Sequence, residues 1–482
     1  MGIGKRAIRS TFFVTVNSYA AFGFGTISSI IMARLLLPEH FGLIALANFF
    51  LSLFGRVKEF GLDYALIHRQ DELEKAFKTH FTLQIGLSVV NLLLVIIATP
   101  LLLKFYSSEV VLILLVLALF TILKSASSTP RIYLEKELSF GRTTMVDIVS
   151  LVLSALLGIG AALLGFGVWS LVVLNVSGII FTFLGLVYVA GWKMRFSSDR
   201  GMMAWFLKFG IYLWVGGVTT FIIFQYNDFI LGTFISAAVL GFYAKAYQFA
   251  QLPTTLVTGI VSRVALPTYS KLQTEKEKLG IAYNLVLRNI FRLSAPFSLL
   301  LFLTSSDLTL VLLGEKWLPM VPLLQLLLIF SLLRPIFDDT GAFLTAIGKP
   351  AMLTRYLSVQ AGLLLVLTPL LVYFFKEQGA ALSLNLVMLV GVLLAYFYAN
   401  KFVSINYRQI FLPTTLAVLL TTVFYFGLLN FLNLNSLAMV VGLIVKVLII
   451  LVSYTFFALM LEKDSLKEDI GLFKEIVRGS NA

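Results

Sequence analysis

The sequence has 482 residues, of which 59% are hydrophobic and 13% are charged, and its mean hydropathy is +0.96. A soluble domain has too little interior for that much apolar side chain, so the composition predicts an all-α polytopic membrane protein. With no cysteine and only three histidines, the chain offers no disulfide, thiolate metal site or cysteine nucleophile. We therefore expect neither a metal nor a cofactor.

Apolar runs of roughly 20 residues, the length that a helix needs to cross a bilayer, predict about fourteen transmembrane helices. The first run is too long to be the core of a cleaved signal peptide, so we interpret it as a retained span. A polar tail at residues 462–482 is expected to form a short amphipathic helix on the membrane surface. In chain order the predicted spans lie near residues 11–36, 41–66, 81–104, 109–127, 143–164, 168–190, 205–234, 237–268, 282–313, 318–347, 352–375, 379–400, 410–432 and 437–461.

Basic residues are distributed unevenly between the two ends of these spans. Only Arg34, Lys104, Lys316 and Lys376 fall at one set of ends. By the positive-inside rule, this bias predicts an even number of spans with both termini in the cytoplasm, and it explains the net charge of +13 better than nucleic-acid binding does. The basic ends carry Lys5, Arg6, Arg9, Arg69, Lys75, Lys78, Arg131, Lys136, Arg142, Lys193, Arg195, Arg200, Lys271, Lys276, Lys278, Lys349, Arg355, Lys401, Arg408, Lys463, Lys467, Lys474 and Arg478.

Two short segments share the pattern G-x-x-A-x-A, each directly after a turn between helices. They begin at Gly42 and Gly241, 199 residues apart, which is close to the length of six spans with their loops. Because both open a span from the same side, they predict two parallel six-helix lobes. We place these lobes at residues 1–203 and 204–400, followed by helices thirteen and fourteen with a cytoplasmic tail at 401–482.

Five segments, all within the first 270 residues, carry a family pattern. They are ARLLLPEHFGLIAL at 33–46, EFGLDYALIHRQD at 59–71, PRIYLEKELSF at 130–140, GFGVWSLV at 165–172 and NDFILGTFISAAVLGFYAKAYQFAQLP at 227–253. As a set they resemble the polysaccharide flippases of the multidrug/oligosaccharidyl-lipid/polysaccharide exporter superfamily. Within it, the sequence is most similar to the O-antigen and colanic-acid-exporter-like translocases.

This resemblance implies a two-lobed transporter of the bacterial inner membrane that opens alternately to each side of a central cavity. Its substrate would be a polyprenyl-pyrophosphate-linked oligosaccharide repeat unit, moved across the membrane for surface polysaccharide biosynthesis. The implied partners are this lipid-linked oligosaccharide, membrane lipids and other polysaccharide-assembly proteins, with no nucleic acid. Related lipid flippases line the cavity with cationic side chains, which directs attention to charges within the spans.

Five cations within the predicted spans are the candidate substrate-binding residues: Arg56, Lys245, Arg334, Arg288 and Arg292. Ionisable groups in a bilayer are costly unless they are paired or wetted, so each is a functional candidate. A guanidinium suits pyrophosphate because it donates two parallel hydrogen bonds, whereas lysine acts as a point charge. Two structural alternatives stay open: Arg334 can form an i,i+4 ion pair with Asp338, and Arg288 with Arg292 can lie near the headgroups.

Three further kinds of residue have candidate roles. Asp228 and Asp338 are candidates for binding a coupling proton or sodium ion, although helix capping or ion pairing is an alternative for Asp228. Gly42 and Gly241 are expected to be close-packing points. Pro253 and Pro335 are expected to kink helices that bend or line a cavity. These positions are Asp228, Asp338, Gly42, Gly241, Pro253 and Pro335.

Two other functions compete with the flippase interpretation. A drug/cation antiporter of the same superfamily needs acidic residues within its lobes, whereas this chain offers more basic than acidic candidates there. A membrane glycosyltransferase or polysaccharide polymerase normally has a sizeable extramembrane loop, and no loop here extends more than about a dozen residues beyond its helix ends. We therefore expect a transporter rather than an enzyme.

Overall fold

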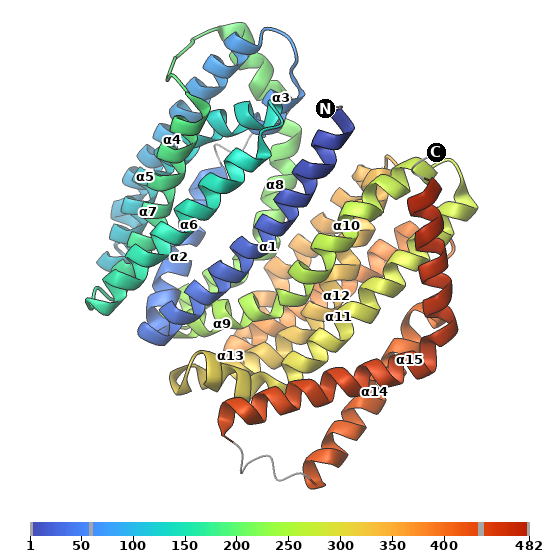
Figure 1. Ribbon diagram of the computed structural model, residues 1–482. Coiled ribbons are helices and arrows are strands. Elements are labelled where there is room, and N and C mark those ends of the chain that lie inside the picture. The colour runs from blue at the N-terminus through green and yellow to red at the C-terminus, as the bar shows by residue number, and fades with distance from the viewer. Residues whose placement is uncertain (1–2, 57–60, 432–437, 480–482) are drawn as a thin grey trace. The chain divides into compact units, whose positions relative to one another are not determined.

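The computed structural model describes residues 3–56, 61–431 and 438–479, and all of the regular elements in these ranges are helices (Figure 1). Among the described residues, nine helices are long and apolar enough to cross a membrane, or ten if one bent pair counts as a single span. The predicted all-α, multi-pass class is therefore confirmed. The number fourteen stays a prediction.

The helices form two compact units, residues 1–244 and 245–482. The first unit contains α1 to α8 and the first half of α9. Their bounds are α1 Ile3–Leu35, α2 Pro38–Gly55, α3 Leu62–His68, α4 Leu73–Leu102, α5 Ser108–Lys136, α6 Phe140–Leu163, α7 Trp169–Ala190, α8 Arg200–Phe234 and α9 Ala237–Ala250.

Local chemistry sets several of these helix ends. Pro38 occupies the first position of α2, where its missing N–H removes no hydrogen bond. Gly165 and Gly167 take positive φ values of 82° and 55°, which allows the tight turn between α6 and α7. Asp199 caps α8 by accepting the Met202 N–H at 2.7 Å, and this hydrogen bond, together with Lys75, lowers the pKa of Asp199.

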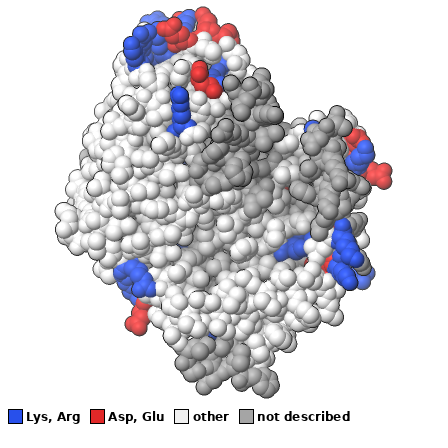
Figure 2. Space-filling view, viewed as in Figure 1, with Lys and Arg blue, Asp and Glu red and all other residues white. Residues whose placement is uncertain are grey.

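Helix α5 forms the centre of the first unit because α2, α4 and α7 all pack against it. The outer faces of α4 and α7 expose large apolar side chains, such as Ile97 at 73% and Tyr188 at 87%. In Figure 2 the visible face of the same unit is a broad uncharged band, with acidic and basic side chains gathered at the end where α3 lies (top in the view). This distribution matches a surface that faces lipid along its length and water at the charged end.

The second unit contains the rest of the chain, and α11 lies at its centre, in contact with α10, α12, α14 and α15. The last two helices therefore pack on this unit through α11. The bounds are α10 Leu252–Leu272, α11 Lys276–Leu312, a 3₁₀ turn Glu315–Met320, α12 Val321–Ala346, α13 Pro350–Ala399, α14 Tyr407–Phe431 and α15 Met439–Gly479.

Helix α13 is two helices joined by a turn at Lys376, whose φ of 50° and ψ of −132° are not helical. The two halves pack side by side: the Gln360 amide donates to the Val387 carbonyl at 3.0 Å, and the hydroxyls of Thr368 and Ser383 are 2.9 Å apart. The predicted break between spans 352–375 and 379–400 lies at this turn. Hydropathy located it because the turn is the only polar interruption in a long apolar run.

Two predicted spans are divided in the structure. The span predicted at 41–66 contains α2 and α3, and residues 57–60 between them lie outside the described residues. The span predicted at 237–268 contains α9 and α10, with Pro253 in the first turn of α10. Proline cannot continue the hydrogen bonding of the preceding helix, so a new helix begins there. Pro335 lies inside α12.

The chain divides into its two compact units between Ala244 and Lys245, whereas the sequence predicts a lobe boundary at 203/204. The difference arises because α8 packs on α2, α3 and α4 of the first unit. The lobe division at 203/204 and 400/401 stays a prediction. The tail beyond residue 462 is helical, as expected, but it continues α15 through a break at Glu462, where φ is −119° and ψ is 15°. Residues 480–482 lie outside the described residues.

Candidate functional site

Arg56 is the only one of the five candidate cations that lies in the first unit, at the C-terminal end of α2. Its guanidinium donates to the carbonyls of Ser52 at 3.3 Å and Gly217 at 3.2 Å, and it lies 5.3 Å from the centre of the Phe221 ring. The Trp214 indole donates back to the Arg56 carbonyl at 2.7 Å. Arg56 therefore joins the end of α2 to α8. Its role in substrate binding stays a prediction.

Lys245 is the first residue of the second unit and is only 5% exposed. Its ammonium donates to the Gln248 side-chain oxygen, three residues later on α9, at 3.1 Å. An ionisable group buried within a predicted span is costly unless it is paired or wetted, so this lysine stays a functional candidate. Its role in substrate binding stays a prediction.

Arg334 forms the ion pair that the sequence offered as its alternative. Its Nε donates to Asp338 Oδ1 at 2.8 Å, one turn further along α12. The guanidinium also lies 6.0 Å from the centres of both the Phe330 and Phe337 rings. The two charges of the pair neutralise each other. Arg334, a candidate phosphate ligand, and Asp338, a candidate ion-coupling residue, are therefore already bonded to one another.

Asp339, next to Asp338, is fully buried on another face of α12. One of its oxygens accepts the Tyr269 hydroxyl at 3.0 Å, and the other has no hydrogen-bond partner. Tyr283 packs beside Tyr269 and pairs with the Thr340 hydroxyl at 2.9 Å. The two neighbouring carboxylates thus have different surroundings, which their adjacent positions in the sequence do not predict.

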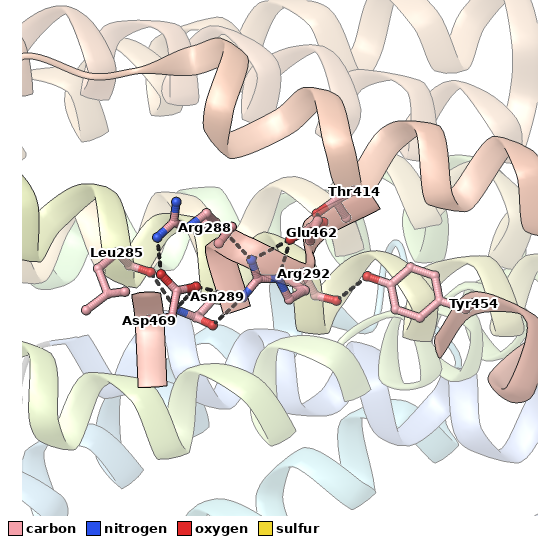
Figure 3. Close-up of polar contacts among 9 residues, drawn as sticks. Leu285, Arg288, Asn289, Arg292, Thr414, Tyr454, Glu462 and Asp469 are labelled. Carbon is pink, nitrogen blue, oxygen red and sulfur yellow. Dashed lines mark hydrogen bonds and ion pairs between the residues drawn. The ribbon is translucent and has the colours of Figure 1, made fainter. Parts of the chain in front are cut away.

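Arg288 and Arg292 on α11 contact carboxylates from the last helix of the chain (Figure 3). Arg292 Nη1 lies 2.8 Å from Asp469 Oδ2, and Arg292 Nε lies 2.5 Å from Glu462 Oε2. Arg288 pairs with the other oxygen of Asp469. We call these four residues the α11–α15 clamp. It holds the helical extension of α15 against α11.

The clamp is completed by neutral groups from α14 and α15. Thr414 on α14 donates to Glu462 at 2.8 Å, and the Tyr454 hydroxyl donates to the Arg292 carbonyl at 2.7 Å. Ser465 accepts from Arg292 at 3.0 Å. The substrate-binding prediction for both arginines is untested, but both already have an anionic partner. Sequence reasoning missed those partners, although Glu462 and Asp469 are seven residues apart and so fall on one helix face.

Asp228 on α8 makes no hydrogen bond or ion pair within the part of the chain that the structure describes, so neither capping nor pairing is seen there. Its neighbour Asn227 donates to the Tyr243 hydroxyl at 2.9 Å. A role for Asp228 in ion coupling stays a prediction.

Gly42 and Gly241 lie where α2 crosses α9 within the first unit. A Cβ atom on Gly42 would lie 1.7 Å from the Ala237 carbonyl oxygen, and one on Gly241 would lie 1.9 Å from the Pro38 carbonyl oxygen. Ala237 and Pro38 are separated by the same 199 residues as the two glycines. The contact is therefore reciprocal, as expected of two repeats that meet about a local twofold axis.

A partly buried polar network in the first unit was not anticipated from the sequence. His80 on α4 contacts Asp63 Oδ1 at 3.1 Å and the Thr129 hydroxyl at 2.9 Å. Gln84 and Ser128 donate to the same Asp63 oxygen at 2.8 Å and 2.5 Å. The network ties α3, α4 and α5 together. Sequence reasoning considered the histidines only as metal ligands and found them too scattered.

Comparison with known families identifies the chain. The family model described as "Polysaccharide biosynthesis protein" matches residues 31–322, more than half of the sequence. The chain belongs to this family.

Polysaccharide biosynthesis proteins from several bacteria align with most of the chain. The lipopolysaccharide biosynthesis protein WzxC of Escherichia coli strain K12 is 24% identical over 85% of this chain and 84% of its own length. The succinoglycan biosynthesis transport protein ExoT of Rhizobium meliloti strain 1021 is 25% identical over 74% of this chain and 72% of its own length. The predicted family resemblance is confirmed.

Solved transporter structures share the fold of this family member. The lipid II flippase MurJ, in an inward closed conformation, matches with a TM-score of 0.76 over 95% of this chain and 100% of its own, at 15% identity. An inward-facing multidrug transporter of the MATE family matches with a TM-score of 0.61 over 78% and 93% of the two chains, at 14% identity. At these identities the matches show the fold alone.

Proposed function

We propose that this protein moves a polyprenyl-pyrophosphate-linked oligosaccharide across the bacterial inner membrane by alternating access, for surface polysaccharide biosynthesis. It acts as a transporter, not an enzyme. Membership of the polysaccharide biosynthesis family over residues 31–322, together with a flippase-type fold along nearly the whole chain, carries the proposal. The alternation of basic helix ends supports cytoplasmic termini.

A groove in the second unit suits the lipid part of such a substrate. It has a volume of about 680 Å³ and lies among α11, α12 and α14, with a mainly apolar lining that includes Phe291, Phe302, Leu326 and Ile329. A polyprenyl chain has no polar groups and needs only an apolar surface that is continuous with the bilayer. The groove therefore offers a site for the tail while the glycan stays in water.

The cations within the spans suit the pyrophosphate. Lys245 is a candidate because it is only 5% exposed within a predicted span, where a bound phosphate would add a strong charge-assisted contact to its ammonium. Arg56 is the candidate of the first unit. Arg288, Arg292 and Arg334 are weaker candidates, since each is already paired with a carboxylate.

Complementation tests both the function and the cation. A bacterial host that lacks its own flippase receives the wild type, Lys245→Gln or the control Lys349→Gln, whose lysine is exposed at a helix end. We expect the wild type and the control to restore surface glycan, and Lys245→Gln to restore at least tenfold less at equal membrane levels. Full activity of Lys245→Gln would reject the site assignment only.

A drug/cation antiporter is the second candidate, favoured by the MATE-type fold and by the buried Asp339 carboxylate with one unpartnered oxygen. The same strains distinguish the two functions. If the wild type restores no surface glycan in hosts that make several different glycans, but raises resistance to cationic drugs, the flippase proposal is wrong.

A further inference from the structure

The second unit has a polar pocket of about 880 Å³ at the end where α11 begins and the link at 400–406 leads into α14. Its lining includes Lys276 and Arg288 from α11, Ser404 and Asn406 from the link, and Arg408 from α14. It is separate from the apolar groove described above, with which it shares no lining residue. We call it the α11–α14 pocket.

The charge of the α11–α14 pocket favours an anion. Its described lining has three cations, Lys276, Arg288 and Arg408, and a single carboxylate, Glu277. Lys276 and Arg408 are exposed and form no ion pair with any described residue. These two long side chains can therefore move to a ligand without breaking an existing contact.

Arg288 provides a fixed donor at the inner wall. Its side chain is 13% exposed and pairs with Asp469 through Nη2, but its Nε–H is buried and has no acceptor. A buried N–H without a partner is unfavourable, and a phosphate oxygen can satisfy it. The pocket thus combines one held guanidinium with two adaptable cations at its rim.

The wall of the pocket is already formed. The Asn284 amide donates to the Ser404 carbonyl at 2.8 Å, and its oxygen accepts the Asn406 N–H at 2.9 Å, which fixes the link against α11. A preformed wall lowers the ordering cost of binding a ligand.

The surroundings of the pocket place it at the level of lipid headgroups. Ile281 and Tyr407, which also line it, are 49% and 42% exposed. Exposed apolar residues continue along the same helices at Leu293 and Leu412. The pocket therefore opens where the charged end of the unit meets its lipid-facing surface. Basic pockets between transmembrane helices on the cytoplasmic side are typical binding sites for anionic headgroups.

From these observations we propose that the α11–α14 pocket binds the phosphate headgroup of an anionic phospholipid of the bilayer. Arg288, Arg408 and Lys276 are its ligands. Because Arg288 also pairs with Asp469, the lipid phosphate and the α15 carboxylate share one guanidinium. The site does not depend on the transported substrate, so its test needs no transport.

Native mass spectrometry of the purified full-length protein tests the site. The probes are phosphatidylglycerol, cardiolipin, phosphatidylethanolamine and inorganic phosphate. We expect Lys276→Gln/Arg408→Gln to bind the two anionic lipids at least about tenfold more weakly than the wild type does. The control Lys349→Gln/Arg355→Gln removes one lysine and one arginine from exposed positions, at the α12–α13 turn and early in α13, and is expected to bind as the wild type does.

Three results would overturn the proposal: equal loss of anionic lipid in both double variants, equal binding of phosphatidylethanolamine and phosphatidylglycerol by the wild type, or binding of inorganic phosphate as tight as that of the lipids. The last result would indicate a site for a soluble phosphate.

A second measurement uses the shared guanidinium. Asp469→Asn frees Arg288, so phosphatidylglycerol should raise the melting temperature of this variant by more than it raises that of the wild type. Asp307→Asn is the matched control, because it breaks an ion pair with Lys446 elsewhere in the unit. Equal lipid-induced shifts in the wild type and both variants would contradict a role for Arg288.

Discussion

Arg292 is 7% exposed, and its guanidinium contacts two carboxylates that belong to a helix more than 160 residues later in the chain. Burying a guanidinium is unfavourable unless its charge is balanced and its N–H groups have acceptors. Here Glu462 and Asp469 supply both the negative charge and the acceptor oxygens. The Arg292 carbonyl is bonded as well, by Tyr454. The clamp therefore combines charge pairing with nearly complete hydrogen bonding, the condition under which a buried ion pair is tolerated.

Glu462→Gln tests the energy of the clamp. The amide can still accept from Thr414 but carries no charge, so Arg292 loses one of its two counter-charges. Breaking a buried pair from one side costs about 3 kcal/mol or more, and thermal unfolding in detergent should show a clear fall in melting temperature.

Glu137→Gln is the control for this measurement, because Glu137 is exposed and forms no ion pair with any described residue. We expect it to change stability by no more than about 0.5 kcal/mol. Equal melting temperatures for Glu462→Gln and the wild type would mean that the clamp adds nothing to stability.

Sequence distance explains which residue contacts could be predicted. Arg334 and Asp338 are four residues apart on one helix, so their pairing was available from helix geometry alone. Arg292 and Glu462 are 170 residues apart, and only the packing of α15 on α11 brings them together. The charges of a polar tail looked like solvated surface in the sequence.

At the scale of helices, the crossing of α2 and α9 depends on the absence of two side chains. The backbones approach so closely that any Cβ on Gly42 or Gly241 overlaps a carbonyl group of the other helix. Carbonyl groups of a helix cannot move aside as a flexible side chain does. The helices must separate to accept even a methyl group.

Gly42→Ala and Gly241→Ala should each destabilise the protein by about 1–3 kcal/mol, as overpacking does in other tightly packed cores. Gly86→Ala is the control: Gly86 lies inside α4 with open space around its Cβ position. Alanine has the higher helix propensity, so this change should be neutral or stabilising by up to about 1 kcal/mol. Thermal unfolding of the three variants measures both effects, and equal melting temperatures would contradict the close contact.

Hydropathy predicted the existence of most helices but not how they are divided. The apolar run at 237–268 gives no sign of a break except Pro253, and a proline can also lie inside a helix, as Pro335 does in α12. In contrast, the turn inside α13 coincides with the polar residues at Lys376 and Glu377. A break that is marked only by backbone geometry needs the structure to reveal it.

At the scale of the whole molecule, the repeat found in the sequence and the reciprocal contact of its glycines support one another. A 199-residue offset relates both the glycines and the residues that they touch. Two segments that contact each other in this way are related by a local twofold axis, which is the relation that a duplicated set of helices produces when both copies run in the same direction.

The predicted orientation of the chain can be tested residue by residue because the sequence contains no cysteine. Single cysteines at exposed positions then report only their own side of the membrane. Ser236→Cys and Lys376→Cys lie at turns predicted to face outward, whereas Gln273→Cys and Lys349→Cys lie at turns predicted to face the cytoplasm. In intact cells with a permeabilised outer envelope, a membrane-impermeant maleimide should label only the first pair. Lysis should expose the second pair.

The two turns that flank the first half of α13, at Lys349 and Lys376, make the sharpest comparison, since one helix of fixed length separates them. Labelling of Lys349→Cys but not Lys376→Cys in intact cells would mean that the orientation is the reverse of the predicted one. Labelling of both residues from outside would show that this helix does not cross the membrane.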